Sequence, residues 1–110
     1  MSNYRPGDII LVEIPFTDLS GSKKRPACVL SAKKKDFLVA FITSKLEQAD
    51  KADVILRKTS ANGLAVDSAV LAQKLFTVHE SLIVRKLGSC AIQERRAILK
   101  AIIPGLERGI

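Results

Sequence analysis

The chain has 110 residues, 47% of them hydrophobic, and a formal net charge of +7. This length fits one domain with a modest core, so residues 1–110 are expected to form a single domain, and the hydrophobic content excludes a disordered chain. The charge favours a polyanionic partner, nucleic acid or an acidic protein segment, although basic charge also serves solubility alone. No apolar run approaches the roughly 20 residues of a membrane span, and the N-terminus lacks the apolar stretch of a signal peptide, so we expect a cytoplasmic protein without membrane contact.

Short apolar runs separated by turn residues predict a mainly β fold. Runs bounded by glycine, proline or charged residues predict strands near residues 8–14, 25–31, 37–43, 53–57 and 81–88. The run at 37–43 is nearly all apolar, which favours a central strand covered on both faces. The Asn62-Gly63 pair predicts a turn, because both residue types tolerate positive φ. Residues 64–72 and 76–79 are expected to be separate extended segments.

The C-terminal part predicts a single amphipathic helix at residues 90–103. Ser89 is its expected N-cap, and Pro104-Gly105 is expected to end it. One broad apolar face is formed by Ile92, Leu99, Ile102, Ile103 and Leu106, opposite a charged face. The predicted fold is therefore a small β-barrel, or a strongly bent sheet, with a C-terminal helix packed against it.

Neither metal nor redox chemistry is indicated. The two cysteines, Cys28 and Cys90, lie far apart in the sequence without metal-ligand spacing, so both are expected to be free thiols. The one histidine, His79, has no carboxylate at an orienting spacing and is expected to be a surface or capping residue. No metal and no cofactor are expected.

The stretch at residues 23–31 (KKRPACVLS) is the most informative of the chain. Three cations precede Pro26, which cannot donate to a β-ladder and is therefore expected at a strand's start or edge. This predicts a charged loop that delivers Arg25 to the first position of a buried strand. The loop before it, of about ten residues from Pro15, is either a mobile lid or a long hairpin connection.

The polar groups around the predicted second and third strands are those that bind a phosphate. Arg25 offers a guanidinium fork at a strand start, and Thr43 and Ser44 offer hydroxyl donors at a strand end. Lys23 and Lys24 add positive charge. These groups suggest phosphodiester binding, and with it cleavage that needs no metal. The alternative is a solvated basic turn, with Thr43 capping the strand end.

Three stretches resemble, in order and spacing, the MazF/PemK/Kid toxins of bacterial type II toxin–antitoxin pairs. They are residues 7–12 (GDIILV), 25–31 (RPACVLS) and 41–44 (FITS). The resemblance implies an SH3-like β-barrel, a homodimer, and a metal-independent endoribonuclease that cuts single-stranded mRNA at short sequences. The implied products carry a 2′,3′-cyclic phosphate and a 5′-OH end, which requires RNA because DNA lacks the attacking hydroxyl.

The resemblance also implies roles for individual residues. Arg25 and Thr43 would be catalytic, Arg25 by neutralising the pentavalent phosphorane and Thr43 by donating to a non-bridging oxygen. Substrate-binding roles are expected for Lys23, Lys24, Ser44, Gln73, Lys74 and Phe16. Gln73 stands near the position of an aspartate in Kid/PemK-type members and cannot take a proton. For base stacking, Phe16 and Tyr4 are the aromatic residues expected to be exposed.

The expected partners are single-stranded RNA and a cognate antitoxin, whose acidic segment would occupy the basic groove. Contact with DNA is expected only through that antitoxin. Two alternatives remain open. One is a gyrase poison like the CcdB toxins, which share the barrel but use aromatic residues at the extreme C-terminus, where this chain has ERGI. The other is a barrel that binds RNA without cutting it.

Overall fold

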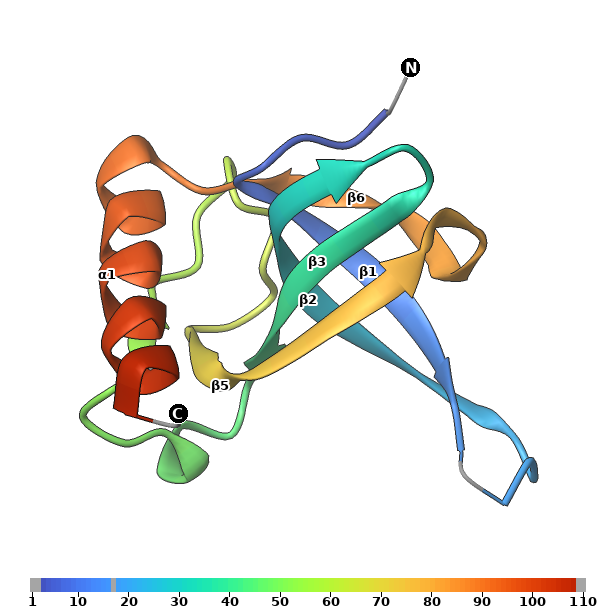
Figure 1. Ribbon diagram of the computed structural model, residues 1–110, viewed down its shortest axis with the longest axis horizontal. Coiled ribbons are helices and arrows are strands. Elements are labelled where there is room, and N and C mark those ends of the chain that lie inside the picture. Colours follow the sequence, from blue (N-terminus) through green and yellow to red (C-terminus); the bar gives the residue numbers. More distant parts are fainter. Residues whose placement is uncertain (1–2, 17, 109–110) are drawn as a thin grey trace.

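Six antiparallel strands form one sheet that curls into a half-barrel, with a single long helix beside it (Figure 1). The computed structural model describes residues 3–16 and 18–108. The strands are β1 (Asp8–Pro15), β2 (Ser22–Lys33), β3 (Asp36–Thr43), β4 (Val54–Leu56), β5 (Ser68–His79) and β6 (Ile83–Ser89), and the helix is α1 (Ile92–Arg108). Two 3-10 turns lie at Leu46–Gln48 and Glu80–Leu82. The prediction of a mainly β, barrel-like fold with a C-terminal helix is confirmed.

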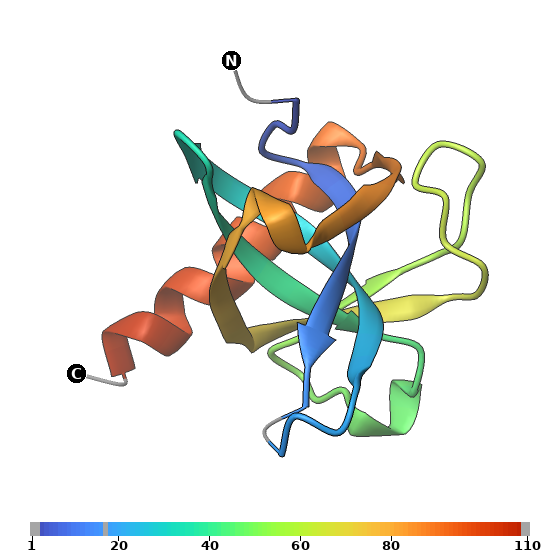
Figure 2. The ribbon, with the colours of Figure 1, turned by 90° about the vertical axis from the view of Figure 1, so that its right-hand side faces the viewer.

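Both faces of the sheet are covered by apolar side chains. The strand order is β4-β5-β3-β2-β1-β6, so β3 is central, as its nearly all-apolar sequence predicted. One cluster fills the inside of the curl, and we call it the interior cluster: Ile10, Val12, Ala27, Val29, Phe37, Val39 and Val78. A second cluster, including Ile9, Cys28, Ile42, Ile98 and Ile102, lies between the sheet and α1. Because side chains alternate along a strand, neighbouring residues such as Ile9 and Ile10 enter different clusters. Figure 2 shows the strands curling in front with the helix behind them.

The β1–β2 hairpin is longer than predicted, and its loop is shorter. The two strands pair as far as Pro15 with Ser22, so Lys23, Lys24 and Arg25 lie within β2 and not on a loop. The prediction of a loop of about ten residues is therefore wrong, and the two strands form a hairpin with a shorter connection. One residue of that segment, Thr17, lies outside the described residues. The hairpin end is held by a hydrogen bond of 2.6 Å that the Ser22 hydroxyl donates to Glu13.

Pro26 lies inside β2, at a position that explains how the sheet tolerates it. It stands opposite Leu11 of β1, while the pairing of β2 with β3 begins only at Ala27. The first part of β2 is thus bordered by one strand alone, and the missing N–H of proline falls where the second ladder has not yet begun.

One twelve-residue strand, β5, replaces the two short segments predicted at 64–72 and 76–79. Its pairing with β3 shifts between Ala40 and Ile42, and the polar pair Gln73-Lys74 falls in the stretch of β5 at this irregularity. The polar residues interrupt the apolar pattern without ending the strand. The last strand begins at Ile83 because a 3-10 turn precedes it, and the His79 side chain accepts a hydrogen bond from the Ser81 amide. This confirms His79 as a capping residue.

The helix differs from the prediction in its ends and in its buried face. It begins at Ile92, continues through Pro104, and has its first turn closed by Glu94, which accepts from the Ala91 amide at 2.9 Å. Ser89 belongs to β6, and its hydroxyl donates to Asp8 instead of capping the helix. No helix in the described part of the chain is long and apolar enough to cross a membrane.

Most of the apolar face predicted for the helix is exposed. Ile98 and Ile102 are buried against the sheet. Four apolar residues of α1 remain 38–59% exposed, and we call them the α1 stripe: Ile92, Leu99, Ile103 and Leu106. At about 100° per residue these four fall within an arc of roughly 60°, beside the buried face and not on it.

Candidate active site

Arg25 and Thr43 lie two residues beyond the last paired position of two neighbouring strands. In the antiparallel register of β2 and β3, Ala27 stands opposite Phe41. Continuing that register by two residues places Arg25 opposite Thr43, on the same face of the sheet. Both residues line one cleft of about 390 Å³. The structure therefore brings together the strand-start arginine and the strand-end threonine that the sequence singled out.

The cleft that holds Arg25 and Thr43 is strongly basic, and we call it the basic cleft. Five cationic residues line it: Lys23, Lys24, Arg25, Lys45 and Arg85. No aspartate or glutamate is among its lining residues in the described part of the chain. The ion pairs found within residues 3–16 and 18–108 lie elsewhere, at Arg57–Asp67 and Lys86–Asp8. None of these five cations forms an ion pair within the described residues.

Thr43 is held firmly at the end of β3. It is 4% exposed, and its hydroxyl oxygen accepts a hydrogen bond of 3.1 Å from the Lys45 amide. The same hydroxyl donates to the side-chain oxygen of Gln48 at 3.4 Å, a long contact. Gln48 is exposed in the turn that follows β3. If its side chain moves aside, the Thr43 hydroxyl is free to donate a hydrogen bond to an anion in the cleft.

The far wall of the basic cleft is the loop of residues 57–67, which is rigidly built. The buried Asn62 side chain accepts from the amides of Thr59 and Leu64 and donates to the Arg57 carbonyl at 2.7 Å. Gly63 has a φ of 70°, and a Cβ there would come within 2.0 Å of the Leu87 carbonyl oxygen. The turn predicted at Asn62-Gly63 is confirmed, with Gly63 as the residue that adopts positive φ. The loop lies tightly against β6 and fixes the width of the cleft.

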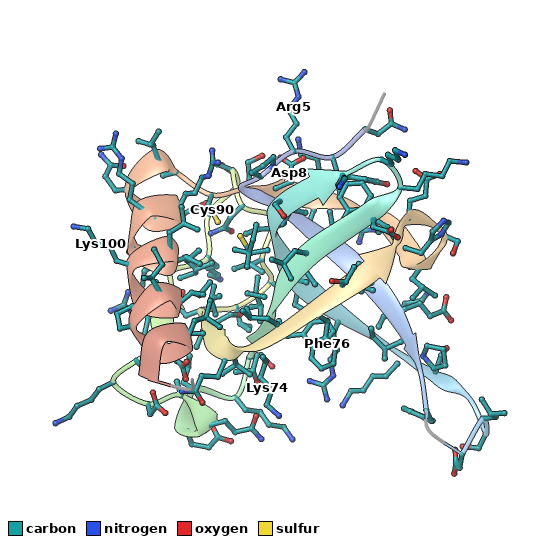
Figure 3. The ribbon with its side chains drawn as sticks, viewed as in Figure 1. Arg5, Asp8, Lys74, Phe76, Cys90 and Lys100 are labelled. Atoms are coloured by element: carbon teal, nitrogen blue, oxygen red, sulfur yellow. The ribbon has the colours of Figure 1, made fainter. Side chains whose placement is uncertain are left out.

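A second cleft of about 350 Å³ adjoins the first, and we call it the aromatic cleft. Three phenylalanines line it, Phe16, Phe41 and Phe76, together with Lys74. Lys23 and Arg25 line both clefts, so the Arg25 side chain lies at their boundary. Figure 3 shows Phe76 and Lys74 extending from β5 toward the lower end of the half-barrel.

The two clefts arise from one simple feature of the sheet. Along each strand, the row of side chains that forms the interior cluster continues past its last buried member. In β2 the row Val29–Ala27 leads to Arg25, in β3 Val39 leads to Phe41 and Thr43, and in β5 Val78 leads to Phe76. The candidate site is the open end of the half-barrel, where the interior rows change from apolar core to aromatic, cationic and hydroxyl side chains.

Most of the predicted site residues meet at these clefts. Arg25, Thr43, Lys23, Lys24 and Ser44 line the basic cleft, and Phe16 and Lys74 line the aromatic cleft. Gln73 lines neither; it lies in a neighbouring depression with Asp50 and Asp53.

Tyr4 is not an exposed stacking residue. It is half-buried and packs edge-on against Phe37 at 5.7 Å between ring centroids. Sequence reasoning missed other members of the site, which are Lys45, Gln48, Arg85, Phe41 and Phe76. Of these only Lys45, two residues after Thr43, could have been found from its position in the sequence.

The two cysteines lie together behind the site, on the α1 side of the sheet. Both are free thiols, as predicted, and their Sγ atoms are 3.9 Å apart although 62 residues separate them. The contact with Cys90, followed by burial, raises the pKa of Cys28, whereas the contact with Cys28 lowers the pKa of Cys90. Among the described residues no group of three or more His, Cys, Asp or Glu side chains is placed to hold a metal ion.

Several solved structures share this fold. An endoribonuclease in complex with its cognate antitoxin, from a Mycobacterial species, is 14% identical, with a TM-score of 0.73 over 97% of this chain and 96% of that one. Toxin MazF-mt6 of Mycobacterium tuberculosis is 19% identical, with a TM-score of 0.68 over 89% and 96% of the two chains. MazE-MazF from Deinococcus radiodurans is 16% identical, with a TM-score of 0.81 over 97% and 98%.

Comparison with curated protein sequences gave no significant match. At identities of 14–19% the solved structures establish the fold alone. A family model extends this to the sequence: residues 5–106 match the model described as PemK-like, MazF-like toxin of type II toxin-antitoxin system. That match covers nearly the whole chain, including both clefts. The chain belongs to the PemK-like, MazF-like toxin family of type II toxin–antitoxin systems.

Proposed function

We propose that this toxin is an endoribonuclease that cuts single-stranded mRNA in the cytoplasm, with Arg25 and Thr43 at the reacting phosphate. The observation that carries the proposal is that these two residues share a cleft whose described lining holds five cations and no carboxylate. A phosphodiester strand supplies the negative charge that such a cleft lacks, and a guanidinium fork suits phosphate oxygens. Membership of the MazF-like toxin family and the likeness in fold to a chain described as an endoribonuclease support the same proposal.

The proposed reaction is transesterification within the RNA strand. The ribose 2′ oxygen forms a bond to the adjacent phosphorus, and the bond from phosphorus to the 5′ oxygen of the next nucleotide breaks. The 2′-OH proton leaves and a proton reaches the 5′ oxygen, giving a 2′,3′-cyclic phosphate and a 5′-OH end. The step needs no cofactor, because every bond that changes lies within the RNA and its protons.

Electrostatic stabilisation is the contribution we assign to the protein. Negative charge grows on the non-bridging oxygens in the transition state, and Arg25 and the Thr43 hydroxyl would donate hydrogen bonds to them. Arg25 is poorly suited to act as the base, since a guanidinium stays protonated at neutral pH. No carboxylate or imidazole lines the basic cleft among the described residues, so we assign the 2′-OH proton to solvent.

The direct test is incubation of the purified protein with a long single-stranded RNA in EDTA. We expect discrete fragments whose 3′ ends carry a cyclic phosphate, and no cleavage of a DNA of the same sequence. A single 2′-deoxy nucleotide placed 5′ to each mapped cut should abolish cleavage there alone. Intact RNA from folded protein would reject the nuclease in favour of an RNA-binding barrel or a gyrase poison.

We also propose two protein partners. The first is a cognate antitoxin: one similar structure is described as an endoribonuclease with its cognate antitoxin, another as MazE-MazF, and the basic cleft suits an acidic segment. Any contact with DNA would then run through that antitoxin. The second is another copy of this chain, because the α1 stripe leaves four apolar side chains exposed in one row.

A further inference from the structure

We propose that the aromatic cleft binds one RNA base next to the cleaved phosphate, stacked on Phe76 with Phe41 behind it. This inference rests on the proposed function and adds where a flanking nucleotide lies. Three of the four phenylalanines in the chain line this one cleft. The fourth, Phe37, is fully buried in the interior cluster.

Phe76 is exposed where the fold does not require a ring. It is 48% exposed, although Val78, two residues later on the same face of β5, is 3% exposed in the core. Its ring centroid lies 4.7 Å from that of Phe41, at an interplanar angle of 37°. Phe41 is half-buried and packs on the interior cluster, so it supports the Phe76 ring, about half of whose surface remains exposed. A supported ring with an open face is what a stacking base requires.

The charges around the rings favour nucleic acid over an apolar peptide. Lys23, Arg25 and Lys74 line the aromatic cleft, and no acidic residue does so in the described part of the chain. Positively charged grooves with aromatic side chains are the common device for holding single strands, since phosphates follow the cations while bases stack on the rings. A volume of about 350 Å³ is of the size that accepts a small planar ligand.

The position of Arg25 connects the two clefts. Because its side chain lines both, a phosphate held there has the basic cleft on one side and the aromatic cleft on the other. A strand that passes through this point places one flanking nucleotide among the lysines and the other beside Phe76. Stacking tolerates every base, so this cleft contributes affinity and position more than sequence selectivity.

The test measures binding and cleavage separately for three variants of Phe76. Phe76→Leu keeps an apolar side chain without a π face, Phe76→Ala removes the side chain, and Phe76→Tyr keeps the ring. The binding probe is a fluorescein-labelled, mixed-sequence RNA with every ribose 2′-O-methylated, so that it cannot be cut. We expect the Leu and Ala variants to weaken binding by roughly 5- to 150-fold, the usual range for one stacked base, and the Tyr variant to stay within about twofold.

A second set of probes identifies the base. Each carries the sequence around a mapped cut with one base removed in turn. Removing the stacked base should weaken binding to the wild type and leave binding to Phe76→Leu unchanged, because the two changes delete the same interaction. Thermal melting checks that each variant folds, and we expect it to do so since Phe76 is half exposed.

The outcomes separate this inference from the proposed function. If the Leu variant binds and cuts RNA as well as the wild type, the stacking site is wrong while the nuclease stands. Phe76 then fits a contact with a protein partner instead. If binding depends on the ring but unmodified RNA stays intact, the stacking site stands and the nuclease is wrong. If the wild type neither binds nor cuts, both are rejected.

Discussion

Arg25 is a strand residue, and this fixes its guanidinium more firmly than a loop could. Its backbone pairs with Val12 of β1, and its side chain leaves the sheet on the face that holds the interior cluster. Among the residues described, the side chain of Arg25 has no hydrogen-bond acceptor and no carboxylate as its partner. A half-buried guanidinium without a partner gains more from an incoming phosphate than a solvated one does, since part of its hydration is already lost.

The contact between Cys28 and Cys90 predicts how the reactivity of Cys90 changes when Cys28 is replaced. The thiols of Cys28 and Cys90 are in hydrogen-bond contact, and this contact holds the pKa of Cys90 below its usual range. Removing the contact with Cys28→Ala should therefore raise the pKa of Cys90. We expect the pH profile of iodoacetamide alkylation at Cys90, followed by mass spectrometry between about pH 6 and pH 10, to move to higher pH.

The matched control for that experiment is Cys28→Ser, whose hydroxyl can still donate. Its alkylation profile at Cys90 should stay nearer to the wild type than that of the alanine variant. Cys28 itself should react slowly in the folded protein, because it is 1% exposed. An unchanged profile in Cys28→Ala would show that the contact does not control the ionisation of Cys90.

At the scale of elements, the sequence predicted which segments are strands better than where they end. Apolar runs located β1, β3 and β4 within one or two residues. The charge of Lys23 and Lys24 predicts a loop, yet both residues extend β2 because β1 offers a pairing edge there. Gln73 and Lys74 remain in β5 for a similar reason, since the ladder on either side of them holds the strand together. Local pattern does not reveal a pairing partner that lies far away in the sequence.

The candidate site was predicted in part, for an equally physical reason. Arg25 and Thr43 could be singled out because each stands at the end of an apolar run. Phe76, Gln48 and Arg85 could not, because their place at the site depends on the curl of the sheet and the return of the 57–67 loop. The helix shows the same limit: its periodicity predicted one apolar face, but of that face only Ile102 is buried against the sheet, together with Ile98, which the predicted face did not include.

The α1 stripe provides a prediction for this element. Ile103→Glu would place a negative charge among the exposed apolar residues of the stripe. If a second copy covers the stripe, this charge must lose its hydration, which costs binding free energy. We expect the homodimer to weaken by at least about 100-fold, measured by sedimentation at several concentrations. Folding should be retained, because Ile103 is already 53% exposed.

Gln93→Glu is the matched control for the stripe. It adds the same charge to an exposed position on α1, about 110° around the helix from the centre of the stripe. It should leave the association unchanged. A dimer that survives Ile103→Glu, or a wild type that stays monomeric at tens of micromolar, would place the interface elsewhere or remove it.

For the whole molecule, the distribution of charge says more than its sum. Six of the 18 lysines and arginines line the two clefts at the open end of the half-barrel, and neither cleft is lined by an acid within the described residues. Acidic residues that form ion pairs, Asp8 and Asp67, lie outside those clefts. The core ends where the cations begin, so one end of the fold supplies stability and the other presents a surface for a polyanion.

We propose that the protein cuts RNA at the open end of the half-barrel and that Arg25 stabilises the reacting phosphate there. The most direct measurement is the single-turnover cleavage rate of a single-stranded RNA by the wild type, Arg25→Ala, and Lys100→Ala, which removes one exposed positive charge from the helix. We predict that the rate falls by about 100- to 1,000-fold or more in Arg25→Ala and stays close to wild type in Lys100→Ala. A folded Arg25→Ala protein that cleaves at the wild-type rate would contradict the account.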